Sequence, residues 1–155
     1  MRVVIFHWKK AEFEERIGWL YAAGYEAEAS DRPIPSYLKQ IGENPPDAIL
    51  VDLSRLPSQG RDVGLQVRKR KTTRLIPLVF VGGAPEKVEM VKGLLPDAVY
   101  TTWEDISEGI QTAISQQNDN PVFHDSAFAG YAGKPLADKL GIKAGMTIAL
   151  VHSPE

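Results

Sequence analysis

The sequence predicts a doubly wound α/β domain in which helices cover both faces of a five-stranded parallel sheet. Short apolar runs of strand length recur over residues 1–116, and segments with apolar residues at helical spacing separate them. Continuous apolar runs are typical of strands that are buried on both faces. Their alternation with helices is typical of parallel sheets, so these two observations together define the fold class.

Five short apolar runs are the expected strands. They cover residues 3–6, 25–29, 48–52, 75–81 and 98–101. Gly24 precedes the second run, and Gly82-Gly83 ends the fourth. Glycines commonly stand in the turns at the ends of helices and strands, so both positions agree with these strand limits. Because parallel strands need long crossover connections, the segments between these runs should hold the helices.

The predicted helices occupy the segments between the strands. Phe13, Ile17 and Leu20 recur at helical spacing in the first of these segments. The later helices are expected around 36–41, over about 61–71, from 85 onward and over 106–114. Pro85 suits the first position of a helix. The tetrapeptide Thr102-Trp103-Glu104-Asp105 has the spacing of a capping box before the last one.

Composition narrows the class of protein. A chain of 155 residues that is 43% hydrophobic can bury a core of its own. The absence of cysteine excludes disulfides, zinc–thiolate sites, iron–sulfur clusters and cysteine nucleophiles, and it suits a cytoplasmic location. A net charge of -2 creates no field toward nucleic acid or membrane. We expect no signal peptide, and no apolar stretch approaches the ~20 residues that span a bilayer.

The chain is expected to divide into a domain over 1–116, a polar linker over 117–125 and a C-terminal extension or truncated second module over 126–155. Tyr131–Leu136 and Lys139–Lys143 resemble the opening of a family of small uncharacterised bacterial proteins. Met146–Val151 reads as an apolar strand that must be covered, because a free strand edge promotes aggregation. Exchange of this extension between two chains would cover it, so we predict a homodimer.

Asp52 is the first candidate functional residue. It closes the apolar run 48–51 and precedes a loop with Pro57 and Gly60, which is where open α/β sheets place their chemistry. The stretch Pro46–Leu53 resembles the segment that carries the phosphorylated aspartate of response-regulator receiver domains. The resemblance covers residues 1–115, implies a flavodoxin-like fold and implies a role in signal transduction.

The chain departs from the receiver pattern at every other position that the chemistry uses. His7-Trp8 replaces the acidic pair that holds Mg²⁺ in receivers, Gly82 replaces the hydroxyl residue, and Thr102-Trp103 replaces the lysine and its following proline. Phosphoryl transfer depends on charge neutralisation and positioning, so these losses should remove activity. We therefore predict a pseudo-receiver that is not an enzyme, has no cofactor or metal, and binds a protein partner. Asp52 would then cap the following loop or pair with Arg55.

Two alternatives remain open at this point. One is a conventional receiver that accepts a phosphoryl group at Asp52. The other is a module that binds a small ligand or a nucleotide in a pocket at the strand ends, and the candidate lining residues are His7, Trp8, Gly82, Thr102 and Trp103. An imidazole among indoles near one carboxylate suits an aromatic or cationic ligand.

One basic cluster follows the third strand. It comprises Arg61, Arg68, Lys69, Arg70, Lys71 and Arg74. Nucleic-acid binding is one interpretation. Cations also stabilise the C-terminus of a helix, and no aromatic residues interleave here for base stacking, so the solvated helix end is favoured.

Overall fold

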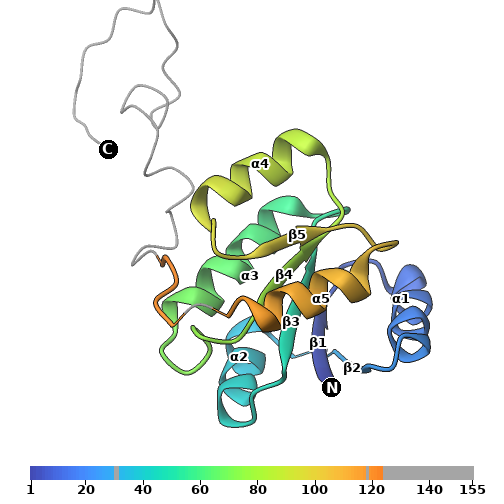
Figure 1. The fold of residues 1–155 in the computed structure, drawn as a ribbon, viewed down its shortest axis with the longest axis horizontal. Coiled ribbons are helices and arrows are strands. Elements are labelled where there is room, and N and C mark those ends of the chain that lie inside the picture. The colour runs from blue at the N-terminus through green and yellow to red at the C-terminus, as the bar shows by residue number, and fades with distance from the viewer. Residues whose placement is uncertain (30–31, 118, 124–155) are drawn as a thin grey trace, which may run out of the picture.

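The computed structural model describes residues 1–29, 32–117 and 119–123. The strands are β1 (Arg2–Phe6), β2 (Glu26–Glu28), β3 (Ala48–Asp52), β4 (Leu78–Val81) and β5 (Val99–Thr101). The helices are α1 (Lys10–Ala22), α2 (Ile34–Glu43), α3 (Pro57–Lys69), α4 (Pro85–Leu94) and α5 (Ile106–Ser115). Strands and helices alternate along the chain as predicted (Figure 1).

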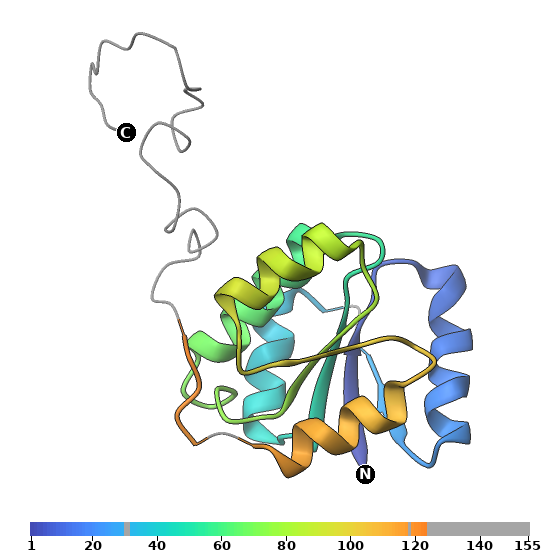
Figure 2. The ribbon, with the colours of Figure 1, turned by 45° about the horizontal axis from the view of Figure 1, so that its top comes forward.

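All five strands are parallel and lie in the order β2-β1-β3-β4-β5. Helices α1 and α5 cover one face of the sheet, and α2, α3 and α4 cover the other (Figures 1 and 2). This is the flavodoxin-like doubly wound arrangement, and the predicted fold class is confirmed. The strand order reverses between β1 and β3, so the carboxyl ends of these two strands border the position where such folds bind ligands.

Alternation along the strands divides the interior into two cores. Val3 and Ile5 of β1 join the core beneath α1 and α5, whereas Val4 and Phe6 join the core beneath α2, α3 and α4. Successive side chains of a strand point to opposite faces, so a sheet with two covered faces needs apolar residues at every position. That requirement explains the continuous apolar runs.

Two element boundaries differ from the prediction by more than two residues. β4 begins at Leu78 rather than at residue 75, because the Ile76 N–H donates to the Thr73 carbonyl (3.1 Å) and closes a turn that leaves Leu75 exposed. α3 begins at Pro57, ahead of the expected residue 61. Its first turn contains Gly60, whose missing side chain lets the helix approach β3: a Cβ there would lie 2.6 Å from a Leu53 methyl carbon. A glycine three residues after a proline suggests a loop in the sequence, but here the glycine allows close packing.

The described chain after α5 lies against the domain. Pro121 is buried, the Val122 N–H donates to Asp97 Oδ2 (2.6 Å), and the Arg74 guanidinium covers the Phe123 ring at 3.7 Å. The expected strand at Met146–Val151, and the dimer exchange built on it, lie outside the described residues. Within the described residues, no helix combines the length and apolar character needed to cross a membrane.

Candidate functional site

Asp52 lies at the carboxyl end of β3 and is 2% exposed. The register places Phe6 beside Val51 and Val81 beside Asp52, so the residue after β1 lies next to this carboxylate. His7 and Asp52 continue the strand positions whose side chains point toward α1 and α5. The same alternation sends Trp8 to the opposite core, where it packs near α2.

The protein itself engages both oxygens of the Asp52 carboxylate. Oδ1 accepts the backbone N–H of Ser54 (2.6 Å), and Oδ2 accepts the indole N–H of Trp103 (2.9 Å). The first bond makes Asp52 the cap of the loop that follows β3, as one of the sequence interpretations expected. The second draws the β5–α5 loop onto the end of β3. A buried carboxylate is stabilised by such donors, and both are directed at it here.

His7 is a third neighbour of the carboxylate, and its side chain is fully buried. Its Nδ1 accepts the backbone N–H of Lys9 (3.0 Å), which assigns the proton of a neutral ring to Nε2. Nε2 lies 3.1 Å from Asp52 Oδ2 and 3.8 Å from Glu12 Oε1. The ring N–H does not point along either line, so no aligned hydrogen bond forms within the described chain. His7 therefore lies close to both carboxylates without an aligned hydrogen bond to either one.

Glu12 forms the outer rim of the site from the first turn of α1. Arg55 and Lys9 donate hydrogen bonds to it and lower the pKa of its carboxyl to about 2. The same contact raises the pKa of Arg55. The expected pairing of Arg55 with Asp52 is therefore corrected, because Arg55 extends outward to Glu12 and leaves Asp52 to neutral donors.

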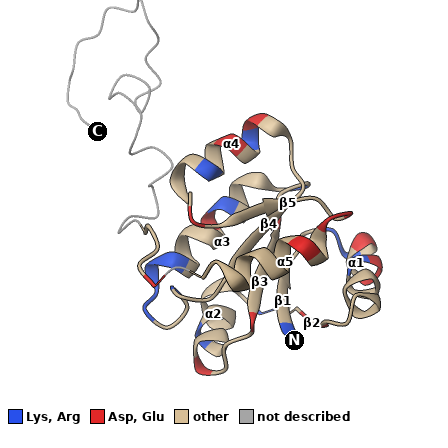
Figure 3. Cartoon of the chain, viewed as in Figure 1, with Lys and Arg blue, Asp and Glu red and all other residues tan. Residues whose placement is uncertain are grey.

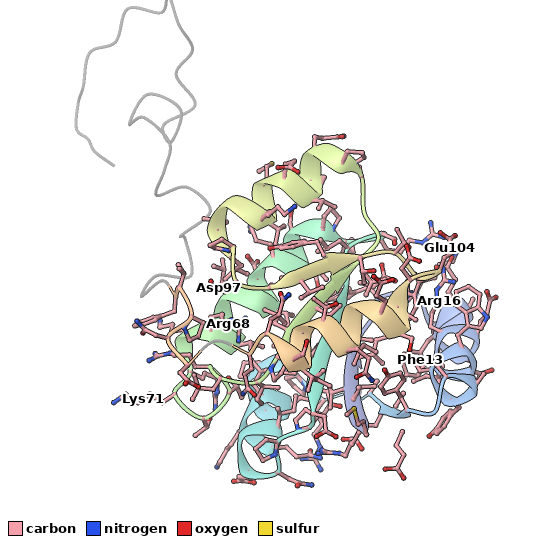
Figure 4. The ribbon with its side chains drawn as sticks, in the orientation of Figure 1. Phe13, Arg16, Arg68, Lys71, Asp97 and Glu104 are labelled. Atoms are coloured by element: carbon pink, nitrogen blue, oxygen red, sulfur yellow. The ribbon has the colours of Figure 1, made fainter. Side chains whose placement is uncertain are left out.

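Trp103 is held on several sides. Its ring meets the edge of Trp19 at a centroid distance of 6.1 Å. The Arg16 guanidinium lies 4.5 Å from the Trp19 ring and 5.1 Å from the Trp103 ring. Figure 4 shows Arg16 of α1 directed toward the β5–α5 loop, near Glu104. Such cation–π and edge contacts add to the indole hydrogen bond and fix the ring over Asp52.

Gly82 and Thr102 occupy the remaining two receiver-like positions. Gly82 has a φ of 71°, and a Cβ there would lie 2.4 Å from Ser54 Oγ and 4.0 Å from Asp52 Oδ1. Thr102 is not the expected N-cap, because α5 begins at Ile106 with Asp105 at the N-cap position, and the Thr102 hydroxyl accepts the Asp105 backbone N–H (3.3 Å) in the preceding turn. Neither residue contributes a hydroxyl or a cation to Asp52.

The five residues suggested as pocket lining do not all border the hollow that lies at the end of β1. His7 and Trp8 border a hollow of about 560 Å³ over the carboxyl end of β1 and beyond β2. Gly82, Thr102 and Trp103 do not border it. The sequence did not single out Glu12, Arg16 or Trp19 as site residues. The sequence held a weak indication for two of them, because Glu12 and Arg16 are four residues apart in a predicted helix and oppositely charged side chains at that spacing can pair. In the structure these two side chains lie 4.0 Å apart.

Residues of the basic cluster form hydrogen bonds with backbone carbonyls at the C-terminus of helix α3 and in the turn after it. Arg68 is 4% exposed, and its guanidinium donates to the Arg74 and Ile76 carbonyls (2.6 and 2.8 Å). Arg74 donates to the Arg68 and Lys69 carbonyls (2.7 and 2.8 Å), which closes the end of the helix. Figure 3 shows Lys and Arg gathered at this corner of the domain. Two members of the cluster are therefore engaged with backbone, in keeping with the helix-end interpretation.

Solved structures with the same arrangement include receiver domains. The signal receiver domain of a histidine kinase from Syntrophus aciditrophicus matches with a TM-score of 0.57 and 17% identity, over 77% of this chain and 93% of that one. A sensor protein from Polaromonas sp. JS666 matches with a TM-score of 0.62 and 18% identity, over 74% and 95%. The receiver domain of a sensor histidine kinase from Pseudomonas aeruginosa, with magnesium in its active-site cleft, matches with a TM-score of 0.54 and 12% identity, over 74% and 97%.

No family model and no curated protein sequence matches the chain. At 12–18% identity, the structural likeness establishes the fold. The described part of the chain is a receiver-fold domain, as the stretch Pro46–Leu53 predicted. Asp52 stands at the end of the strand where the sequence comparison placed the phosphorylated aspartate of receivers.

The residues around Asp52 do not fit the magnesium that such domains use. Mg²⁺ requires oxygen ligands in a near-octahedral arrangement. Here the carboxylate faces an imidazole and an indole, both of its oxygens accept N–H groups, and Glu12 is paired with Arg55. Among the residues that the structure describes, no group of three or more His, Asp or Glu side chains could hold a metal ion.

Proposed function

We propose that this chain is a non-catalytic, receiver-like signalling module that acts through protein–protein interaction and does not accept phosphate at Asp52. One observation carries the proposal: both oxygens of this carboxylate accept hydrogen bonds from the chain itself, and one of the donors is the indole of Trp103. In this interpretation, the aspartate is a structural anchor for two loops at the strand ends.

The energetics of phosphoryl transfer support this view. An attacking Asp52 Oδ2 would have to release the Trp103 N–H, and hydrogen bonds to charged groups contribute about 1.5–3 kcal/mol each. Cations that neutralise the transferred group supply much of the catalysis in such reactions. Arg55, a cation that interacts electrostatically with Asp52, is paired with Glu12, and the buried His7 is already flanked by two carboxylates.

The direct test is incubation of the full chain with Mg²⁺ and acetyl phosphate, followed by intact mass spectrometry. We expect no phosphoryl adduct, whereas a conventional receiver domain treated in parallel should be labelled. Asp52→Asn and the surface control Asp62→Asn should give the same unlabelled spectrum as the native chain. A stoichiometric adduct that survives in Asp62→Asn but disappears in Asp52→Asn would establish the phosphoryl-accepting alternative.

The structure also favours a specific surface for interaction. Trp19 is 42% exposed although it lies in the ring cluster with Arg16 and Trp103. Aromatic and arginine side chains are enriched where proteins bind each other. We propose that the exposed edge of this cluster, rather than the carboxylate beneath it, is part of the contact with a protein partner.

A further inference from the structure

The turn that joins α3 to β4, at the amino-terminal end of the sheet, is held by buried hydrogen bonds. Thr73 is fully buried, and its hydroxyl donates to the Val67 carbonyl (2.7 Å). The Arg68 guanidinium donates to the carbonyls of Arg74 and Ile76 (2.6 and 2.8 Å). Because these bonds fix the backbone of the turn, the side chains on its outer side have little ordering left to lose when a partner binds.

Two outer side chains of this turn border one open hollow of about 380 Å³. Leu75 is 45% exposed, and Lys71 is exposed without an ion pair among the described residues. Figure 4 shows Lys71 extended away from the domain. The other apolar residues that line the hollow are Pro45, Pro46, Ile76, Pro77 and Ile114. We call it the turn hollow. Its volume is at the small end of the range for ligand sites, which suits a single apolar side chain of a partner.

Exposed apolar surface continues on the chain that follows α5. Val122 and Phe123 are 43% and 40% exposed, and the Arg74 guanidinium of the same turn covers the Phe123 ring at 3.7 Å. Gln117 donates to the Leu75 carbonyl (2.7 Å), which holds the end of α5 beside the turn. Exposed apolar side chains from two segments therefore gather at one corner. Such gatherings commonly mark interaction sites.

The charge of this corner favours an acidic partner. Lys69, like Lys71, is exposed and forms no ion pair within the part of the chain that the structure describes. Figure 3 shows Lys and Arg gathered here. The carboxylates of Asp47 and Asp97 at this end each accept a backbone N–H (2.8 and 2.6 Å), so they are bonded within the domain. Complementary charge around an apolar contact chiefly determines which partner binds.

We propose that the turn hollow binds an acidic segment of a partner protein. One apolar side chain of that segment would enter the hollow beside Leu75, and its carboxylates would lie near Lys69 and Lys71. A nucleic acid would also meet the cations, but it offers no aliphatic side chain for the hollow. The proposal goes beyond the signalling role. It does not depend on whether Asp52 accepts phosphate, so the mass-spectrometric assay and the binding assay can fail separately.

Fluorescence anisotropy of labelled peptides with the full chain tests the proposal. The first probe is a heptapeptide of glutamates with one central leucine, and we expect it to bind saturably. Replacement of its leucine by alanine should weaken binding about fivefold, because less apolar surface is buried. A heptapeptide of glutamines with the same leucine should bind much more weakly than the first probe, and added salt should weaken only the glutamate peptides.

Matched variants locate the contact. Lys71→Gln and Leu75→Ser should each weaken the first probe severalfold while urea unfolding changes little, because both side chains are exposed. Lys87→Gln and Met90→Ser make the same changes at exposed residues of α4, which do not border the turn hollow, and binding should be kept.

Three results would overturn the proposal. One is the absence of saturable binding at millimolar peptide, or equal binding of the glutamate and glutamine peptides. Another is tighter binding of a random-sequence DNA duplex that Lys71→Gln abolishes, which would assign the corner to nucleic acid. The third is displacement of the first probe by a peptide of residues 124–155, which would assign the turn hollow to the chain's own extension.

Discussion

At the scale of single residues, the central feature is a buried carboxylate that binds loops together. Asp52 accepts one donor from its own loop and one from Trp103, 51 residues later in the chain. The burial of a charged group is tolerated only when such donors compensate its lost hydration. The carboxylate and the indole should therefore depend on each other for stability.

Replacement of Trp103 by phenylalanine tests this dependence. Trp103→Phe retains a ring but removes the N–H that Asp52 Oδ2 accepts, so we expect a loss of about 1.5–3 kcal/mol in the free energy of unfolding. Trp103→Ala removes the ring as well and should cost about 3 kcal/mol or more. Urea denaturation measures both. The control Trp19→Phe changes a half-exposed ring and should cost less than either. Equal stability of Trp103→Phe and the native chain would show that the indole bond contributes nothing.

The lowered pKa of Glu12 predicts how the free energy of unfolding depends on pH. Its pKa falls from 4.5 to about 2 because Arg55 and Lys9 donate to the ionised form. A carboxyl whose pKa is lowered by folding contributes stability above its unfolded pKa, and that contribution is lost as pH falls toward the folded value. In Glu12→Gln, the decline in unfolding free energy between pH 4.5 and 2 should be shallower than in the native chain. Glu15→Gln, a change at an exposed residue, is the control and should keep the native slope.

At the scale of elements, the turns at the strand ends decide which side chains the site can hold. The turn after β4 carries two glycines in the left-handed region, Gly82 and Gly83, with φ of 71° and 97°. The receiver pattern expects a hydroxyl residue where Gly82 stands. The backbone here has adopted a conformation that such a residue rarely takes, so the site cannot recover the hydroxyl by a single substitution without strain.

A pair of glycine substitutions makes this measurable. Gly82→Thr introduces a β-branched residue at positive φ and places its Cβ 2.4 Å from Ser54 Oγ, so we expect a loss of about 1–3 kcal/mol. Gly93→Ala in α4 meets no atom within 4 Å and should stabilise by about 0.5–1 kcal/mol. Thermal unfolding monitored by circular dichroism compares the two. A native-like melting temperature for Gly82→Thr would mean that the turn is free to rearrange.

At the scale of the whole molecule, both cores and the entire sheet lie within residues 1–115. The described chain beyond α5 contacts the domain at the amino-terminal end of the sheet, where its partners include Arg74, Leu75 and Asp97. This is the end opposite to Asp52. We therefore expect the receiver-fold domain to fold without the C-terminal extension.

Truncation after Gln117 tests this independence and the dimer prediction together. The shortened chain should unfold cooperatively, with a small loss of stability from the missing contacts of Val122 and Phe123. Light scattering should give a dimer for the full chain and a monomer for the truncated one. A full chain that is monomeric at high concentration would contradict the dimer, and an unfolded truncated chain would contradict the domain boundary.

The sequence by itself determined the alternation of strands and helices. It also showed that positions 7, 8, 82 and 102 lack the residue types that the receiver pattern has there. These properties are local, because continuous apolar runs and helical spacing are written in neighbouring residues. The resemblance of Pro46–Leu53 also located the carboxylate on its strand. The first turn of α3 was missed because Gly60 contributes close packing against β3, which a local pattern does not reveal.

Only the tertiary structure decided how the side chains at the strand ends are partnered. Trp103 hydrogen-bonds to Asp52, whereas Trp8 packs against the core on the opposite face of the sheet. Arg55 pairs with Glu12, although Asp52 is much closer to it in the sequence. The pocket beyond β2 likewise arises from the short strand and from two helices on opposite faces. These outcomes depend on which face each residue occupies and on contacts between segments that are 43 to 51 residues apart, so they follow from packing rather than from neighbours in the chain.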